Sequence, residues 1–160
     1  MSIKANGALV FVLAISSTLA TAQDKPGKTT SGHARAPQVV SGPGAPKPSG
    51  PYSQAIKAGD FVFATGQTGR DPATDRVEGD ITAQTNRALN NLAAVLSAAG
   101  TSMDRVVKTT VYLKNMSDFA KVNEIYGTYF KSNPPARTTI GVVALRSSDA
   151  LVEIEMIALQ

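Results

Sequence analysis

The sequence of 160 residues predicts an α+β fold in which two helices pack on one face of a mixed sheet. Two segments carry apolar residues at helical spacing, and strand-like segments rich in β-branched residues lie before, between and after them. The predicted order in the folded body is β-β-α-β-α-β-β. No segment is repeated elsewhere in the chain, so we expect one sheet and one core.

The first half of the folded body is predicted to hold a strand pair and a long helix. In order, its elements are a strand at 52–57, a turn at 58–60, a strand at 61–65, a loop at 71–75 and a helix at 81–99. Asp80 is suited to accept a hydrogen bond from the free amides at the start of this helix. Gly100 is suited to end it, because glycine readily adopts the left-handed conformation found there.

The second half is predicted to alternate strands with a shorter helix. Its elements are a strand at 106–113, a helix from about residue 117 to 130, a strand at 138–145, a turn at 147–149 and a strand at 151–159. Pro134 and Pro135 follow the helix, and they end it because the residue before a proline avoids the helical conformation.

Residues 1–22 have the form of an export signal. Lys4 precedes an apolar run from Ala8 to Ile15, and small residues continue to Ala22. The run is shorter than the ~20 apolar residues that a membrane-spanning helix needs. We expect cleavage after Ala22, a periplasmic or secreted mature chain, and no stable membrane anchor. A buried core helix and an uncleaved signal anchor are the alternatives.

Residues 23–50 are predicted to be a flexible, basic tail ahead of a folded domain at 51–160. Pro, Gly, Ser and Thr occupy 15 of these 28 positions, which leaves little apolar surface to offset the entropy lost on ordering. The chain has a formal net charge of +4, but residues 51–160 hold 11 basic and 11 acidic side chains. A neutral domain lacks the charge of a phosphate-backbone binder, so we expect no nucleic-acid partner.

Cysteine is absent from the chain, and the single histidine, His33, falls in the predicted tail. These two facts exclude a thiol nucleophile, a disulfide and a thiolate zinc site. They also exclude Ser-His-Asp catalysis and a multi-histidine metal site from the folded body. Carboxylates, Arg, Lys, Tyr, Ser, Thr and backbone amides remain to carry any chemistry.

Arg137 and the pair Glu153 and Glu155 are the most unusual polar residues of the body. Arg137 stands between a Pro-Pro pair and an apolar strand, where its guanidinium can hold a small carboxylate or form a structural ion pair. The two glutamates lie two positions apart in an apolar strand and therefore project from the same face. A carboxylate there either serves a substrate as proton acceptor or water-orienting group, or faces solvent or an interface.

Two short segments add candidate residues for the same site. Tyr52 offers a phenol, Thr65 offers a hydroxyl, and Gly66 lets a ligand approach the main chain closely. Each of these signals is weak alone, since most Tyr and Thr residues have structural roles.

These features occur together and in order with several other short motifs. The motifs are Gly50-Pro51-Tyr52-Ser53-Gln54-Ala55, Gly66-Gln67, Asp71-Pro72-Ala73-Thr74, Val107-Lys108-Thr109-Thr110-Val111, Asp118-Phe119, Val122-Asn123, Pro135-Ala136-Arg137 and Val152-Glu153-Ile154-Glu155. Over about residues 45–160 the chain resembles the reactive intermediate deaminase family, also called RidA/YjgF. The resemblance implies a chorismate-mutase-like α+β fold and a homotrimer with clefts between subunits. It also implies hydrolysis of 2-imino or 2-enamino acids to 2-oxo acids and ammonia, without a metal or an organic cofactor.

The resemblance further implies roles for individual residues. Arg137 is expected to hold the substrate carboxylate, helped by the backbone amide of Thr139, and Glu153 is expected to orient or activate water. The remaining matches are the cleft residues Tyr52, Thr65 and Gly66 and a structural residue of the second helix, Asn123. Thr139 departs from the family pattern, because many members carry cysteine there, and this makes thiol-dependent side activities implausible.

Two other functions stay open at the level of sequence. One is a non-catalytic trimeric module that binds small carboxylates or protects partner proteins, which the predicted export away from intracellular imino acids favours. The other is an endoribonuclease, since nuclease activity occurs among relatives of this kind, although a neutral body without histidine argues against it.

Overall fold

The computed structural model describes residues 36–160 of the chain. The predicted signal peptide at 1–22, the first part of the predicted tail and His33 lie outside the described residues. Among the helices of the described part, none combines the length and the hydropathy needed to span a membrane.

One mixed sheet forms the body of the molecule. Its strands are β1 (Gln38–Val40), β2 (Ala55–Ala58), β3 (Phe61–Thr68), β4 (Val106–Leu113), β5 (Ala136–Gly141) and β6 (Val152–Leu159). They lie in the order β1-β2-β3-β6-β4-β5. Strands β4 and β5 pair in parallel, whereas every other neighbouring pair is antiparallel. The predicted mixed sheet is therefore confirmed.

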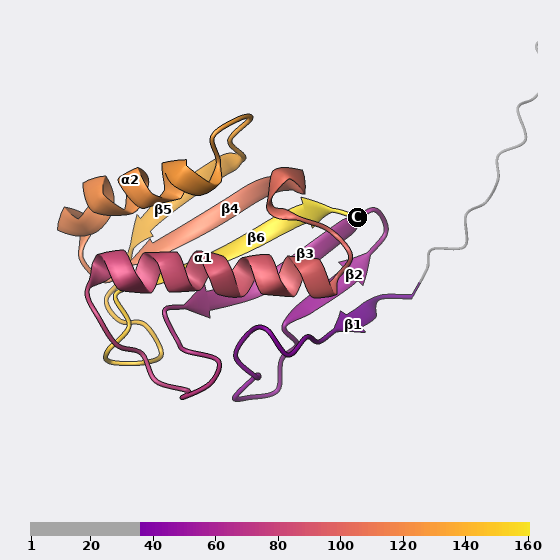
Figure 1. The fold of residues 1–160 in the computed structure, drawn as a ribbon, viewed down its shortest axis with the longest axis horizontal. Helices are drawn as coiled ribbons and strands as arrows, with labels where there is room; N and C mark the ends of the chain where they lie inside the picture. Colours follow the sequence, from indigo (N-terminus) through magenta and orange to yellow (C-terminus); the bar gives the residue numbers. More distant parts are fainter. Residues whose placement is uncertain (1–35) are drawn as a thin grey trace, which may run out of the picture. The chain divides into compact units, whose positions relative to one another are not determined.

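Both helices lie on the same face of this sheet, as predicted (Figure 1). They are α1 (Ile81–Ala98) and α2 (Phe119–Tyr129), and short 3-10 turns at Met103–Arg105 and Met116–Asp118 precede β4 and α2. Asp80 caps α1 as expected, because its Oδ1 accepts a hydrogen bond of 2.9 Å from the Ala83 amide.

The core fills the space between the helices and the sheet. Along β6, burial alternates with a period of two, so that Val152, Ile154 and Met156 face the helices and are at most 1% exposed. Leu89 and Leu92 of α1 meet them from the other side and are fully buried. Burying each such side chain contributes about 1.5–3 kcal/mol to folding.

No element of residues 36–160 covers the opposite face of the sheet. Phe61 and Phe63 of β3 are 40% and 44% exposed on this face, and Ile140 of β5 is 44% exposed. Glu153 and Glu155 project from the same face, as the period of the strand predicted. An uncovered sheet face that carries large apolar side chains is typical of a surface that meets another protein.

The boundary predicted between a flexible tail and the domain, at residue 51, is wrong. Strand β1 is hydrogen-bonded to β2, and Val40 and Ala45 belong to the buried core. The buried side chain of Gln54 makes one hydrogen bond to a backbone amide and three to backbone carbonyls of the loop that follows β1. These long-range bonds order a segment whose composition alone favours disorder.

Four of the predicted strands differ from the structure at one boundary or more. The predicted strands at 52–57, 61–65, 138–145 and 151–159 correspond to β2, β3, β5 and β6. Strand β2 begins only at Ala55, because the chain turns just before it, where the Tyr52 amide donates to the Gly50 carbonyl. Strand β5 ends at Gly141 because its partner β4 ends opposite, at Leu113.

Candidate active site

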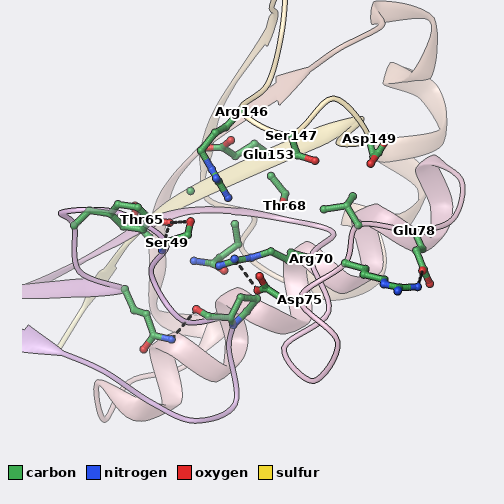
Figure 2. Close-up of a pocket in the computed structure, with 17 residues that line it drawn as sticks. Ser49, Thr65, Thr68, Arg70, Asp75, Glu78, Arg146, Ser147, Asp149 and Glu153 are labelled. Carbon is green, nitrogen blue, oxygen red and sulfur yellow. Dashed lines mark hydrogen bonds and ion pairs between the residues drawn. The ribbon is translucent and has the colours of Figure 1, made fainter.

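A cleft of about 790 Å³ lies where β3 ends and β6 begins (Figure 2). The loop before β2, the second half of β3, the loop that follows β3 and the loop between β5 and β6 form its walls. Four of the predicted site residues line this cleft, namely Tyr52, Thr65, Gly66 and Glu153. The other three predicted residues, Arg137, Thr139 and Asn123, do not line it.

Glu153 is the half-buried carboxylate at the floor of the cleft. It lies on β6 opposite Thr68 of β3 and Tyr112 of β4. Burial raises the pKa of Glu153, the neighbouring negative charge of Glu155 raises it further, and the positive charge of Arg146 partly opposes both. A carboxylate with a raised pKa is a stronger base when ionised and a usable acid when protonated.

A β-bulge brings the backbone of β3 against this carboxylate. Ala64 pairs with Met156 and Gln67 pairs with Ile154, so two residues of β3, Thr65 and Gly66, stand opposite one residue of β6.

Gly66 packs directly on Glu153 at this bulge. A Cβ added at Gly66 would lie only 2.1 Å from Oε1 of Glu153. The absence of a side chain at this position therefore lets the carboxylate sit against the main chain.

Tyr52 lies at the rim of the cleft and is 44% exposed. Its hydroxyl is 3.1 Å from both the amide nitrogen and the hydroxyl of Ser49. These hydrogen bonds lower the pKa of Tyr52. Thr65 is fixed through its backbone amide, which donates to the Gln54 carbonyl at 3.0 Å.

Arg137 lies on β5 and its guanidinium is held against α2. One guanidinium nitrogen donates to Oδ1 of Asn123 at 2.5 Å, and the group stacks 4.6 Å from the ring centre of Tyr126. The Phe119 ring lies 5.8 Å away on α2. Asn123 thus contacts the predicted anchor residue directly. Thr139 follows on the same strand, opposite Val111 of β4.

Within one chain the predicted site is divided between the two faces of the sheet. Arg137 is paired with Thr109, which is buried beneath the helices, whereas Glu153 projects from the uncovered face. Strand β4 separates β5 from β6, so the two backbones lie about 10 Å apart. Sequence reasoning placed these residues in one site without detecting this separation.

Other cleft residues were missed by the sequence analysis. Arg70, Arg76 and Arg146 all line the cleft, but each stands in a loop without a motif that would single it out. Within residues 36–160, no group of three or more His, Cys, Asp or Glu side chains is arranged to hold a metal ion.

Comparisons with known proteins agree on one family. The family model described as Endoribonuclease L-PSP matches residues 43–160. The RutC family protein PH0854 of Pyrococcus horikoshii is 53% identical over 122 residues, which cover 76% of this chain and 96% of that protein. The human 2-iminobutanoate/2-iminopropanoate deaminase is 44% identical over 124 residues, covering 77% of this chain and 90% of the human protein.

Solved structures give the same result. The structure of the Rid family protein YyfA from Yersinia pestis superposes with a TM-score of 0.76 at 46% identity and covers 78% of this chain and 100% of that one. A protein from Entamoeba histolytica described as a putative endoribonuclease L-PSP superposes with a TM-score of 0.75 at 42% identity, covering 78% and 99% of the two chains. The chain therefore belongs to the RidA/YjgF family, whose family model carries the name Endoribonuclease L-PSP.

Proposed function

We propose that this protein hydrolyses 2-imino and 2-enamino acids to 2-oxo acids and ammonia. The observation that carries the proposal is the Glu153 carboxylate, which burial makes more basic and which lies against the backbone of Gly66 in an open cleft. Mouse and human relatives named 2-iminobutanoate/2-iminopropanoate deaminase, at 45% and 44% identity, support the reaction class.

The chemistry requires little beyond positioning and proton transfer, because an imine is already electrophilic. The oxygen of a water molecule bonds to the imine carbon, and the C=N electron pair moves to nitrogen, which takes up a proton. Ionised Glu153 accepts the proton that the water loses and returns it to the nitrogen. The carbinolamine hydroxyl then loses its proton to Glu153, which passes that proton to the nitrogen. The C–O bond becomes C=O as the C–N bond breaks, and ammonia leaves.

We further propose that a homotrimer completes the site. Arg137 and Glu153 lie on different faces of the sheet within one chain, so a small substrate cannot bridge them there. The uncovered sheet face, with Phe61 and Phe63 exposed, supports association between copies. In the proposed trimer, Arg137 of one subunit binds the substrate carboxylate in the cleft that contains Glu153 of its neighbour.

The reaction is tested by generating 2-iminopropanoate in situ and following its loss in the presence of the protein. Wild type is expected to accelerate the loss, and Arg137→Ala is expected to lower kcat/KM about 100-fold or more as ~3 kcal/mol of anchoring disappears. Equal rates with and without wild-type protein would contradict the deaminase proposal.

Subunit mixing tests whether the site is shared. Co-expressed Arg137→Ala and Glu153→Gln chains assemble at random, and about one quarter of the shared sites then draw an intact Arg and an intact Glu from different subunits. About one quarter of wild-type activity is therefore expected from the mixture and almost none from either variant alone. An inactive mixture that elutes as a trimer would contradict sharing across subunits.

The same preparation distinguishes the other functions considered. Ligand-dependent melting shifts without turnover would favour a binding module, and degradation of RNA by highly purified protein would favour a nuclease.

Export is a separate proposal that rests on residues 1–22 of the sequence. We expect the full chain, expressed in a Gram-negative host, to appear in the periplasmic fraction with a mature N-terminus at Gln23. A cytoplasmic chain that keeps Met1 or Ser2 would contradict it.

A further inference from the structure

Arg146 brings a positive charge into the cleft that the proposed reaction does not use. It stands in the loop between β5 and β6, and Figure 2 shows its guanidinium directed into the cavity beside Glu153. Tyr52 and Glu153 line the same cavity, and the positive charge of Arg146 acts to lower the pKa of each.

The other two arginines of the cleft are already paired. Arg70 is 2.7 Å from Asp75, and it also donates to a backbone carbonyl at 2.5 Å. Arg76 is 3.6 Å from Glu78. By contrast, Arg146 has no ion pair and no hydrogen bond within residues 36–160. Its donors are thus available to a ligand.

The cleft also has room for more than the smallest imino acids, since its volume of about 790 Å³ is at the upper end of the range for small-molecule pockets. If Arg137 of a neighbouring subunit holds the carboxylate beside the imine, a second anionic group on the substrate lies in the cleft that Arg146 lines. A guanidinium binds a carboxylate through two parallel hydrogen bonds, which adds direction as well as charge.

We propose that Arg146 is a specificity-determining residue that binds a side-chain carboxylate, so that the preferred substrates are 2-imino dicarboxylic acids. This inference rests on the proposed deaminase function and names its substrate class. Such substrates arise wherever the α-amino group of an acidic amino acid is oxidised to the imine.

A competing explanation is that Arg146 only adjusts the ionisation of Glu153. The two explanations differ in one measurable way. An effect on Glu153 alters the hydrolysis of every imino acid alike, whereas a binding role alters the preference between substrates. The ratio of kcat/KM for 2-iminoglutarate to that for 2-iminopropanoate therefore separates them.

The experiment measures this ratio for wild type, Arg146→Gln, Arg146→Lys and Arg146→Glu, with both imines generated in situ. We expect the ratio to fall about 10- to 100-fold in Arg146→Gln, to recover partly in Arg146→Lys, and to fall furthest in Arg146→Glu. Arg76→Gln is the matched control. It removes the same charge from the same cleft, and we expect it to keep the ratio within about threefold of wild type.

A wild type that hydrolyses both imines but whose ratio is the same in all Arg146 variants would overturn the role of Arg146 while leaving the deaminase proposal intact. A wild type that hydrolyses neither imine would overturn the deaminase proposal. In that case, the melting temperature measured with 2-oxoglutarate and with pyruvate decides whether Arg146 recognises a second carboxylate. An equal shift with both ligands would overturn that role as well. A shift with 2-oxoglutarate that Arg146→Gln leaves unchanged would also overturn it.

Discussion

The substitution Gly66→Ala tests the position of the Glu153 carboxylate without removing any functional group. The added Cβ would lie 2.1 Å from Oε1, 2.9 Å from Cδ and 3.0 Å from Cγ of Glu153. An unstrained contact between carbon and oxygen needs about 3.3 Å, so the carboxylate has to move by about 1 Å. Gly66 is not among the residues with positive φ, so alanine introduces no backbone strain there.

A displacement of about 1 Å at a reacting group lowers the rate by about 100-fold. We therefore expect Gly66→Ala to lower kcat/KM for 2-iminopropanoate by about two orders of magnitude. The fold should survive, because the atoms that must move belong to the far end of a flexible side chain. A melting temperature within about 4 °C of wild type would agree with this expectation, since it corresponds to a change of about 1 kcal/mol.

The measurement is the loss of in situ generated 2-iminopropanoate, followed for wild type, Gly66→Ala and a matched control. Gly127→Ala provides the control, because an added Cβ meets no atom within 4 Å on the exposed side of α2. There we expect unchanged kinetics and about 0.5–1 kcal/mol of added stability from the better helix former. A folded Gly66→Ala protein with wild-type kcat/KM would refute the assignment of Glu153 to the reaction.

Glu153→Gln should abolish turnover yet raise the melting temperature by about 1–4 °C at pH 8. Because the pKa of Glu153 is raised in the folded state, its contribution to stability is present at low pH and is lost as the pH rises through the folded-state pKa. The increase in melting temperature caused by Glu153→Gln should therefore vanish below about pH 4, which a pH series of melting curves measures. Gln54→Leu should lower the free energy of unfolding by about 2–4 kcal/mol, measured by urea denaturation, because it leaves buried backbone groups of the loop after β1 without partners. Asn123→Ala should lower kcat/KM about tenfold by releasing the Arg137 guanidinium, and Asn123→Asp should restore part of that loss.

The helices were predictable because their signals are local. The apolar positions of α1 repeat every three or four residues, and Asp80 accepts from the first turn as a capping residue should. Strand β1 was not predictable in the same way. Its order depends on pairing with β2 and on the side chain of Gln54, a polar residue that the hydrophobic pattern gives no reason to place in the interior.

In the candidate site, as in the fold, features set by neighbouring residues could be predicted from the sequence, whereas features set by long-range pairing could not. The two-residue period of a strand predicts that Glu153 and Glu155 share a face of the sheet, and in the structure they do. The bulge at Thr65 and Gly66 depends on how β3 pairs with β6, a partner nearly ninety residues away in the chain. Within the sequence of β3, no feature other than Gly66 predicts the bulge.

The division of the site between two faces explains why Arg137 and Glu153 look structural when each is considered alone. Arg137 is held by Asn123 and an aromatic ring under α2, and Glu153 is half-buried in a sheet face that other residues leave uncovered. Neither residue has, within one chain, the other group that the proposed reaction needs. Burial disfavours the ionised form of the Glu153 carboxylate, and the positive charge of Arg137 from a neighbouring subunit would offset that cost. Association of copies and formation of the site are thus expected to depend on the same face, so a substitution that prevents assembly should remove activity even when every proposed catalytic residue is present.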